Sequence, residues 1–148
     1  MAQERAKPEV RESAGDEPLS EAFWAVARRL REMSQEALAP WDISPSQLRA
    51  LRVLKRYGTM RLSELSDHLH IAARSATEVV DALESHGLVQ RRPDPADRRA
   101  TLVEVTGHGA TILDSIRAAR GAEAERVFGR LSAADRAELG RILRALQD

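Results

Sequence analysis

The sequence predicts a mainly helical domain that carries one small β-ribbon, and two observations support this fold class. Between residues 60 and 105, two short helical patterns are followed by two strand-like runs with an arginine-rich turn between them. On both sides, over about residues 19–38 and 107–147, apolar residues recur at helical spacing. The order of elements over about residues 44–105 is that of a winged helix-turn-helix, a shape suited to reading duplex DNA.

The β-ribbon is the most specific part of this pattern. Residues 88–92 and 100–105 are the predicted strands, and the sequence PDPADRR, residues 93–99, is the predicted turn. The segment carries only Asp94 and Asp97 as acids. It is crowded with arginines, namely Arg91, Arg92, Arg98 and Arg99. A hairpin can carry such charges merely to protect its edges, but after two helices of this pattern a DNA-contacting wing is favoured.

The helix expected over about residues 72–86 is the predicted reading helix, and Gly87 closes it. Its buried stripe follows the spacing i, i+3, i+4, i+7 and consists of Ala76, Val79, Val80 and Leu83. The first turns of a helix in the major groove meet the base edges. The predicted base-reading residues are therefore Arg74, Ser75, Thr77 and Glu78. Asp81 lies further along and can instead pair with an arginine within the fold.

Two strings in this region, VVDALESHGLVQRRPDPADRRATLVEVTGHG (residues 79–109) and SPSQLRALRVL (residues 44–54), resemble the MarR family of bacterial transcriptional regulators. The resemblance covers about residues 20–147, and the Asp-Arg-Arg wing is its most specific signal. It implies one MarR-like domain over residues 19–148 and a homodimer that binds a pseudo-palindromic operator. It further implies a repressor whose DNA binding is weakened by a small molecule or an oxidant.

Arg98 and Arg99 follow the turn at the far end of the ribbon. A narrow ribbon tip with a flat guanidinium suits the minor groove of A·T-rich DNA. The sequence does not decide which of the two enters the groove, and Arg98 is favoured. By resemblance to the family, Asp97 shapes the wing, and it is close enough in sequence to pair with one arginine and orient the other.

The remaining elements follow from local signals. Residues 1–18 are polar and mixed in charge, which predicts a disordered tail. Ser44, Pro45 and Gln47 predict a capping box that opens a helix ending at Gly58. Ser44 is also a candidate contact to the DNA backbone, although capping alone accounts for it. Residues 60–62 predict a short third strand, followed by a helix that Ser63 caps.

The helices at the two ends of the domain carry more apolar surface than a chain of 148 residues needs. Thr106 is the predicted N-cap of the helix that starts near residue 107, and Ser132 with Asp135 resembles a further capping box. This surplus, together with the family resemblance, predicts that the helices over 19–38 and 107–147 form a dimerisation layer with two-fold symmetry. Packing within one chain is the alternative for the first helix. By resemblance an effector pocket would lie between this layer and the reading lobe, with Phe23, Trp24 and Trp41 as candidate lining residues.

Composition narrows the function classes. Formal net charge is zero, so a DNA-binding surface requires segregated charge. Without cysteine there is no thiol switch, and without a signal peptide or an apolar run of membrane-spanning length a cytoplasmic location is expected. His68 and His70 lack partners at metal-ligand spacing, and no catalytic motif is present, so neither a metal, a cofactor nor an enzyme is predicted. Glu78 and Asp81 leave one alternative open, a winged-helix module that binds protein.

Overall fold

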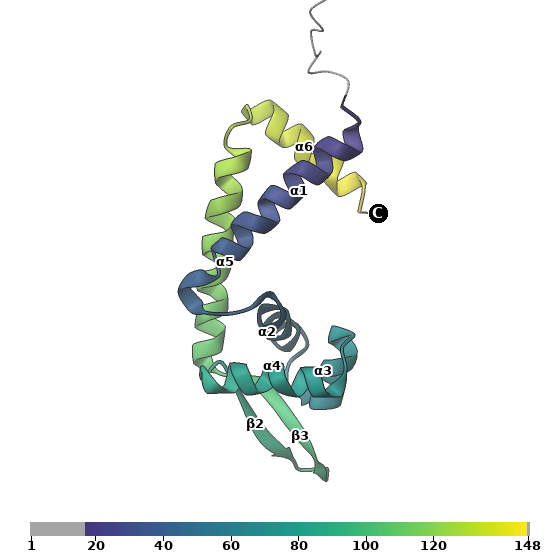
Figure 1. The fold of residues 1–148 in the computed structure, drawn as a ribbon, viewed down its shortest axis with the longest axis vertical. Helices are drawn as coiled ribbons and strands as arrows, with labels where there is room; N and C mark the ends of the chain where they lie inside the picture. The colour runs from purple at the N-terminus through teal and green to yellow at the C-terminus, as the bar shows by residue number, and fades with distance from the viewer. Residues whose placement is uncertain (1–16, 148) are drawn as a thin grey trace, which may run out of the picture.

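The computed structural model describes residues 17–147, so the predicted tail lies almost wholly outside the described residues. It confirms the predicted fold class (Figure 1). In chain order the elements are α1 (Leu19–Glu36), η1 (Ala39–Trp41), α2 (Pro45–Tyr57), β1 (Met60–Arg61), α3 (Leu62–Leu69), α4 (Ala73–Ser85), β2 (Val89–Asp94), β3 (Asp97–Val105), α5 (Gly107–Phe128) and α6 (Ala133–Ala145).

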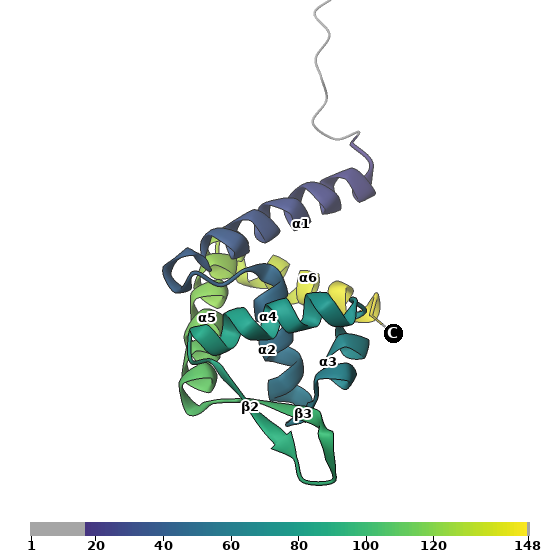
Figure 2. The same ribbon diagram turned by 60° about the horizontal axis from the view of Figure 1, so that its bottom comes forward.

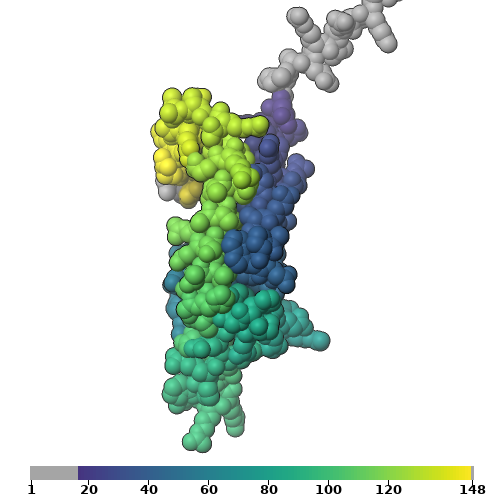
Figure 3. Space-filling view, turned by 90° about the vertical axis from the view of Figure 1, so that its left-hand side faces the viewer, coloured from purple at the N-terminus to yellow at the C-terminus, as the bar shows by residue number. Residues whose placement is uncertain are grey.

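The molecule is elongated, with a reading lobe at one end and terminal helices at the other. The lobe contains α2, α3, α4 and the sheet, and its lower edge is formed by α4 and the projecting β2–β3 hairpin (Figure 1, Figure 2). From the lobe, α5 rises along one side to α6, and α1 lies against α5 (Figure 3). The surface predicted to read DNA therefore lies opposite the helices predicted to form the dimer.

The hydrophobic core sits in the reading lobe and reaches the lower half of α5. Its largest fully buried side chains come from α2, α3, α4, both long strands and α5: Leu51, Leu65, Val80, Leu83, Val89, Val103 and Ile116. By contrast, α1 and α6 bury no residue. Several of their apolar side chains are exposed, reaching 86% of the maximum for Leu19, and Leu146 at the end of α6 is 77% exposed.

The sheet is antiparallel in the order β1-β3-β2. Met60 and Arg61 of β1 pair with Val103 and Leu102 of β3, which confirms the short third strand except for Leu62, which begins α3. The hairpin strands run further than predicted, because β2 extends to Asp94 and β3 starts at Asp97. The predicted seven-residue turn is therefore wrong. A register shift at Pro93/Asp94 lets the ladder continue through the proline, which cannot donate a ladder hydrogen bond.

Three of the predicted helix caps are present. Ser44 accepts a hydrogen bond from the Gln47 amide at 3.2 Å, and the Gln47 side chain accepts one from the Ser44 amide. The hydroxyls of Thr106 and Ser132 accept from the amides three residues on. The cap predicted at Ser63 is wrong, because α3 already begins at Leu62 and Arg61 occupies the N-cap position. The Glu64 carboxylate instead accepts from the Arg61 amide at 2.7 Å.

A tight junction joins the reading lobe to α5. The Thr106 hydroxyl donates to the Gly87 carbonyl at 2.6 Å, and the Thr106 amide donates to the Leu88 carbonyl at 3.0 Å. Gly109, in the first turn of α5, lies directly against this Leu88 carbonyl. A Cβ atom added at Gly109 would lie 2.1 Å from that oxygen, so only glycine fits there.

Candidate nucleic-acid interface

The first two turns of α4 present the predicted reading residues to solvent. The Arg74 side chain is 91% exposed and that of Glu78 is 68% exposed, and the two form an ion pair at 3.4 Å across one helical turn. Ser75 is also exposed. The Thr77 hydroxyl donates to the Ala73 carbonyl at 3.0 Å, which leaves its oxygen free to accept. This face therefore offers both donors and acceptors to a base edge.

The wing places its two terminal arginines beside different neighbours. Arg99 lines a hollow together with Arg61 and Ser63 at the start of α3. Arg98 lines a separate hollow with Arg92 and Pro93 of β2. Successive residues of a strand point to opposite faces, which accounts for the separation. Among the described residues, neither guanidinium has an acidic partner within 4 Å, so both remain available to an external anion.

The other two wing arginines are engaged within the fold. Arg91 forms ion pairs with Asp81 and Glu84 of α4, which confirms that Asp81 pairs internally. Partial burial acts to lower the pKa of Arg91, but the hydrogen bonds that its guanidinium donates to Asp81 and Glu84 outweigh this effect and raise the pKa. Arg92 lies 3.6 Å from Glu104 of β3. The arginine cluster of the sequence thus divides into two structural residues and two free ones.

The two acids of the turn bond differently from the sequence-based expectation. Asp97 was expected to pair with an arginine side chain, but its carboxylate accepts from the backbone amide of Arg99 at 3.0 Å. The arginine partner belongs to Asp94, which is buried and lies 2.7 Å from Arg61. The Ala96 amide and the Arg61 guanidinium hold the pKa of Asp94 below its usual range. Sequence reasoning missed Asp94, whose only signal was an acid between two prolines.

The three aromatic residues proposed to line an effector pocket are not gathered in one cavity. Phe23 and Trp24 lie on exposed α1, in edge-to-face contact with 5.3 Å between ring centroids. Trp41 lies in η1, beyond the other end of α1, and packs partly buried against the core. Ser44, the candidate contact to the DNA backbone, is exposed immediately before α2. Its hydroxyl oxygen accepts the capping hydrogen bond.

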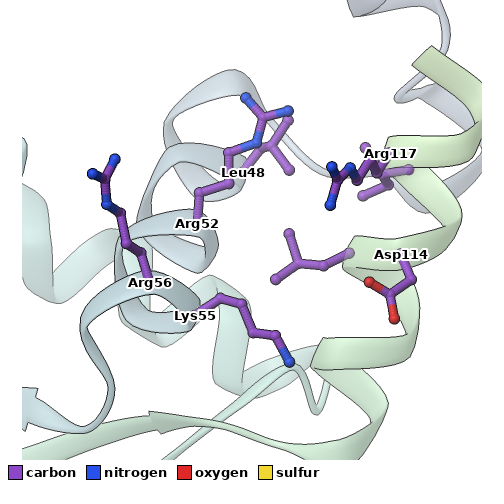
Figure 4. Close-up of a pocket in the computed structure, with 8 residues that line it drawn as sticks. Leu48, Arg52, Lys55, Arg56, Asp114 and Arg117 are labelled. Carbon is purple, nitrogen blue, oxygen red and sulfur yellow. The ribbon is translucent and has the colours of Figure 1, made fainter. Parts of the chain in front are cut away.

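A cleft of about 340 Å³ lies elsewhere, between α2 and the lower half of α5 (Figure 4). Its floor is apolar and consists of Leu48, Leu113 and Ile116. Charged side chains from both helices surround the opening, namely Arg52, Lys55, Arg56, Asp114 and Arg117. In the described part of the chain none of these cations forms an ion pair. Burial and the neighbouring charge of Arg52 lower the pKa of Arg120, and Asp114 is the one acid among the residues that line the cleft.

Known proteins with similar sequences identify the family of this chain. A family model described as MarR family matches residues 43–101. The regulator Mb0904 of Mycobacterium bovis is 35% identical over 130 residues, which are 88% of this chain and 85% of that protein. The chain belongs to the MarR family. Its MarR-family relatives include the transcriptional repressor NicR of Pseudomonas putida, 30% identical over 84% of this chain and 78% of NicR. The match to the regulator YsmB of Bacillus subtilis is 30% identical and spans 62% of each chain.

Solved MarR-family structures share the fold. Wild-type MarR from E. coli without ligand matches with a TM-score of 0.76 and 26% identity, covering 89% of this chain and 98% of that one. A cysteine-to-serine mutant of MarR complexed with operator DNA matches with a TM-score of 0.63 and 27% identity, covering 88% and 94%. Within residues 17–147 no helix has the length and apolar character needed to cross a membrane. In the same range no His, Asp or Glu side chains cluster in threes as metal ligands.

Proposed function

We propose that this protein is a homodimeric repressor that binds a pseudo-palindromic operator and responds to a small molecule. The observation that carries the proposal is the lower edge of the lobe. There α4, which carries the exposed reading residues, and the β2–β3 hairpin, which carries Arg98 and Arg99, lie at the same end of the molecule (Figure 1). A helix of this kind fits the major groove, and a ribbon beside it reaches the neighbouring backbone or minor groove. The operator complex of a MarR relative supports the assignment.

Selection of duplexes from fragments of the source genome tests this function directly. We expect an enriched sequence with two-fold symmetry, because an isologous dimer presents two equal reading helices. The logarithm of the association constant should fall linearly with the logarithm of the salt concentration, since each phosphate contact releases condensed counterions. Failure to enrich any sequence would refute the proposal. The protein-binding alternative is less favoured, because Asp81, one of the two acids that suggested it, is paired with Arg91.

Arg74 is the residue we expect to read a base, because its exposed guanidinium stands at the first turn of α4. Replacing Arg74 with alanine should cost about 1–3 kcal/mol at the operator if the contact is bidentate. The loss should be smaller on a scrambled duplex of equal length, measured by fluorescence anisotropy at the same salt concentration. An equal loss on both duplexes would assign Arg74 to the phosphate backbone instead.

Arg98 is the wing residue we favour for the minor groove. Replacing Arg98 with alanine should weaken operator binding at least about tenfold, or about 1.4 kcal/mol. The slope of log K against log salt should also decrease by about one if a phosphate contact is lost. Arg99→Ala, measured in parallel, is the matched comparison, because both arginines are free and adjacent. A larger loss for Arg99→Ala would exchange the two roles.

The cleft between α2 and α5 is our candidate effector site. Its apolar floor and the unpaired cations around its opening suit an anion with an apolar body, because the cations can bond the anionic group while the floor covers the apolar part. The cleft lies between α2 of the reading lobe and α5, the helix that leads to the predicted dimerisation layer. A ligand in the cleft would therefore contact both helices. Titration with an aromatic carboxylate such as benzoate should stabilise the protein thermally, and Arg52→Gln should remove the effect. An unchanged response in Arg52→Gln would exclude this cleft.

A further inference from the structure

Arg61 stands where three elements of the reading lobe meet. Its backbone pairs with Leu102 in the sheet, and its amide donates to the Glu64 carboxylate at the start of α3. Its guanidinium reaches outward to the wing, where Nε and one terminal nitrogen both lie 2.7 Å from Oδ2 of Asp94. One side chain thus connects the start of the helix-turn-helix to the tip of the ribbon.

Asp94 is the other half of this contact, and its surroundings are unusual for a hairpin tip. It is buried, with 8% of its surface exposed, while the neighbouring residues of the turn are exposed. A buried carboxylate is costly unless its oxygens are bonded. Here Oδ1 accepts from the Ala96 amide at 2.9 Å, and Oδ2 is held by Arg61. The register shift at Pro93/Asp94 marks the point where the strand bends.

The outer half of the wing has little else to hold it. β1 pairs only with Val103 and Leu102 at the base of β3, so residues 93–101 form a two-stranded ribbon. Within the described chain, the Arg61–Asp94 pair is the only ion pair or hydrogen bond that joins residues 93–101 to an element outside the hairpin. Two-stranded ribbons are marginally stable by themselves. The direction of the tip, and of Arg98 and Arg99 on it, therefore depends on this contact.

We propose that the Arg61–Asp94 contact positions the wing for DNA, so that Arg61 acts as a positioning residue and not as a phosphate contact. The proposal rests on the proposed DNA-binding function and adds a residue pair to it. Arg61 and Arg99 line one hollow of about 330 Å³ between α3 and the outer wing. The contact therefore sets the distance between the wing arginines and the helices that lie on the same duplex.

Charge removal at Asp94 distinguishes the two roles, because they predict opposite signs. If Arg61 binds phosphate directly, Asp94→Asn frees a cation and should tighten binding, and Arg61→Gln should reduce the salt slope by about one. If the pair positions the wing, Asp94→Asn and Arg61→Gln should each weaken binding about tenfold. The double variant should then be no weaker than either single variant, because both changes remove one contact. Tighter binding by Asp94→Asn, or additive losses, would overturn the proposal.

The experiment uses the full-length protein and the duplex that wild type selects from a randomised pool. Asp67→Asn is the matched control, because it removes the same charge from an exposed position of α3 and should not weaken binding. Arg61→Lys keeps the charge and should recover part of the affinity that Arg61→Gln loses. Hydrogen exchange of the Ala96 amide gives a readout without DNA and should accelerate in Arg61→Gln. Unchanged exchange would overturn the contact itself, whereas failure of wild type to select a duplex would overturn the proposed function.

Discussion

Replacing Gly109 with alanine will destabilise the protein by about 3 kcal/mol, at the upper end of the cost of overpacking. The added Cβ would lie 2.1 Å from the Leu88 carbonyl oxygen and 2.9 Å from a Val105 side-chain carbon. The obstacle is backbone, so a rotamer change cannot relieve it. The Leu88 carbonyl must move, which disturbs its hydrogen bond from the Thr106 amide. Urea unfolding followed by circular dichroism measures the change.

Gly107→Ala is the matched control for this prediction. Gly107 begins the same helix, but a Cβ atom there meets nothing within 4 Å. Alanine should leave the free energy of unfolding unchanged or raise it by up to about 1 kcal/mol, because glycine loses more conformational entropy on folding. If both variants unfold at the urea midpoint of wild type, the junction is not as tight as described.

Placing aspartate at Ile142 of α6 and at Leu146, the residue that caps its C-terminus, will reduce operator affinity by about 10²–10⁴-fold without touching the DNA surface. The two side chains are 41% and 77% exposed in the single chain, and α6 buries no residue there. In the proposed dimer they are covered by the partner, so a buried charge should separate the subunits. Affinity falls because each half-site is then bound by a separate monomer, and the second binding event is no longer intramolecular.

Sedimentation velocity provides the accompanying measurement. Wild type should be dimeric at micromolar concentration and the double variant monomeric. Ala134→Asp is the control, because it adds the same charge in the exposed first turn of α6, where the helix dipole favours an acid. A wild-type protein that sediments only as a monomer would refute the dimer, and a dimeric double variant would place the interface elsewhere.

The order of the elements could be predicted because it depends on local signals. Periodicity gave α4 to within one residue at each end, and Ser44, Thr106 and Ser132 marked three helix starts through their caps. The ends of the wing strands were missed. They depend on Asp94, whose partner Arg61 is 33 residues away in sequence. A contact between residues this far apart in the chain produces no periodic pattern in the sequence.

The candidate site was partly predictable for the same reason. The exposed face of α4 follows from the helical period once the buried stripe is known. The sequence does not show which arginines are free of ion pairs. Arg91 and Arg98 have similar local sequences, and only the packing of α4 beside β2 pairs Arg91 with Asp81 and Glu84. Phe23, Trp24 and Trp41, the residues that the sequence suggests for an effector pocket, do not line the cleft between α2 and α5. Its walls are set by how α2 packs on α5, and long charged side chains at its rim gave no pattern in the sequence.

The continuity of α5 has a geometric consequence for DNA recognition. The helix has 22 residues, which at 1.5 Å per residue gives a rod of about 33 Å. Its base is fixed to the reading lobe by the junction around Gly109, so the lobe must turn with it. A tilt of about 5° at the terminal end would displace the base by about 3 Å, close to one base-pair step of about 3.4 Å. In the proposed dimer, a tilt of this size would thus shift the register of one reading helix against its half-site.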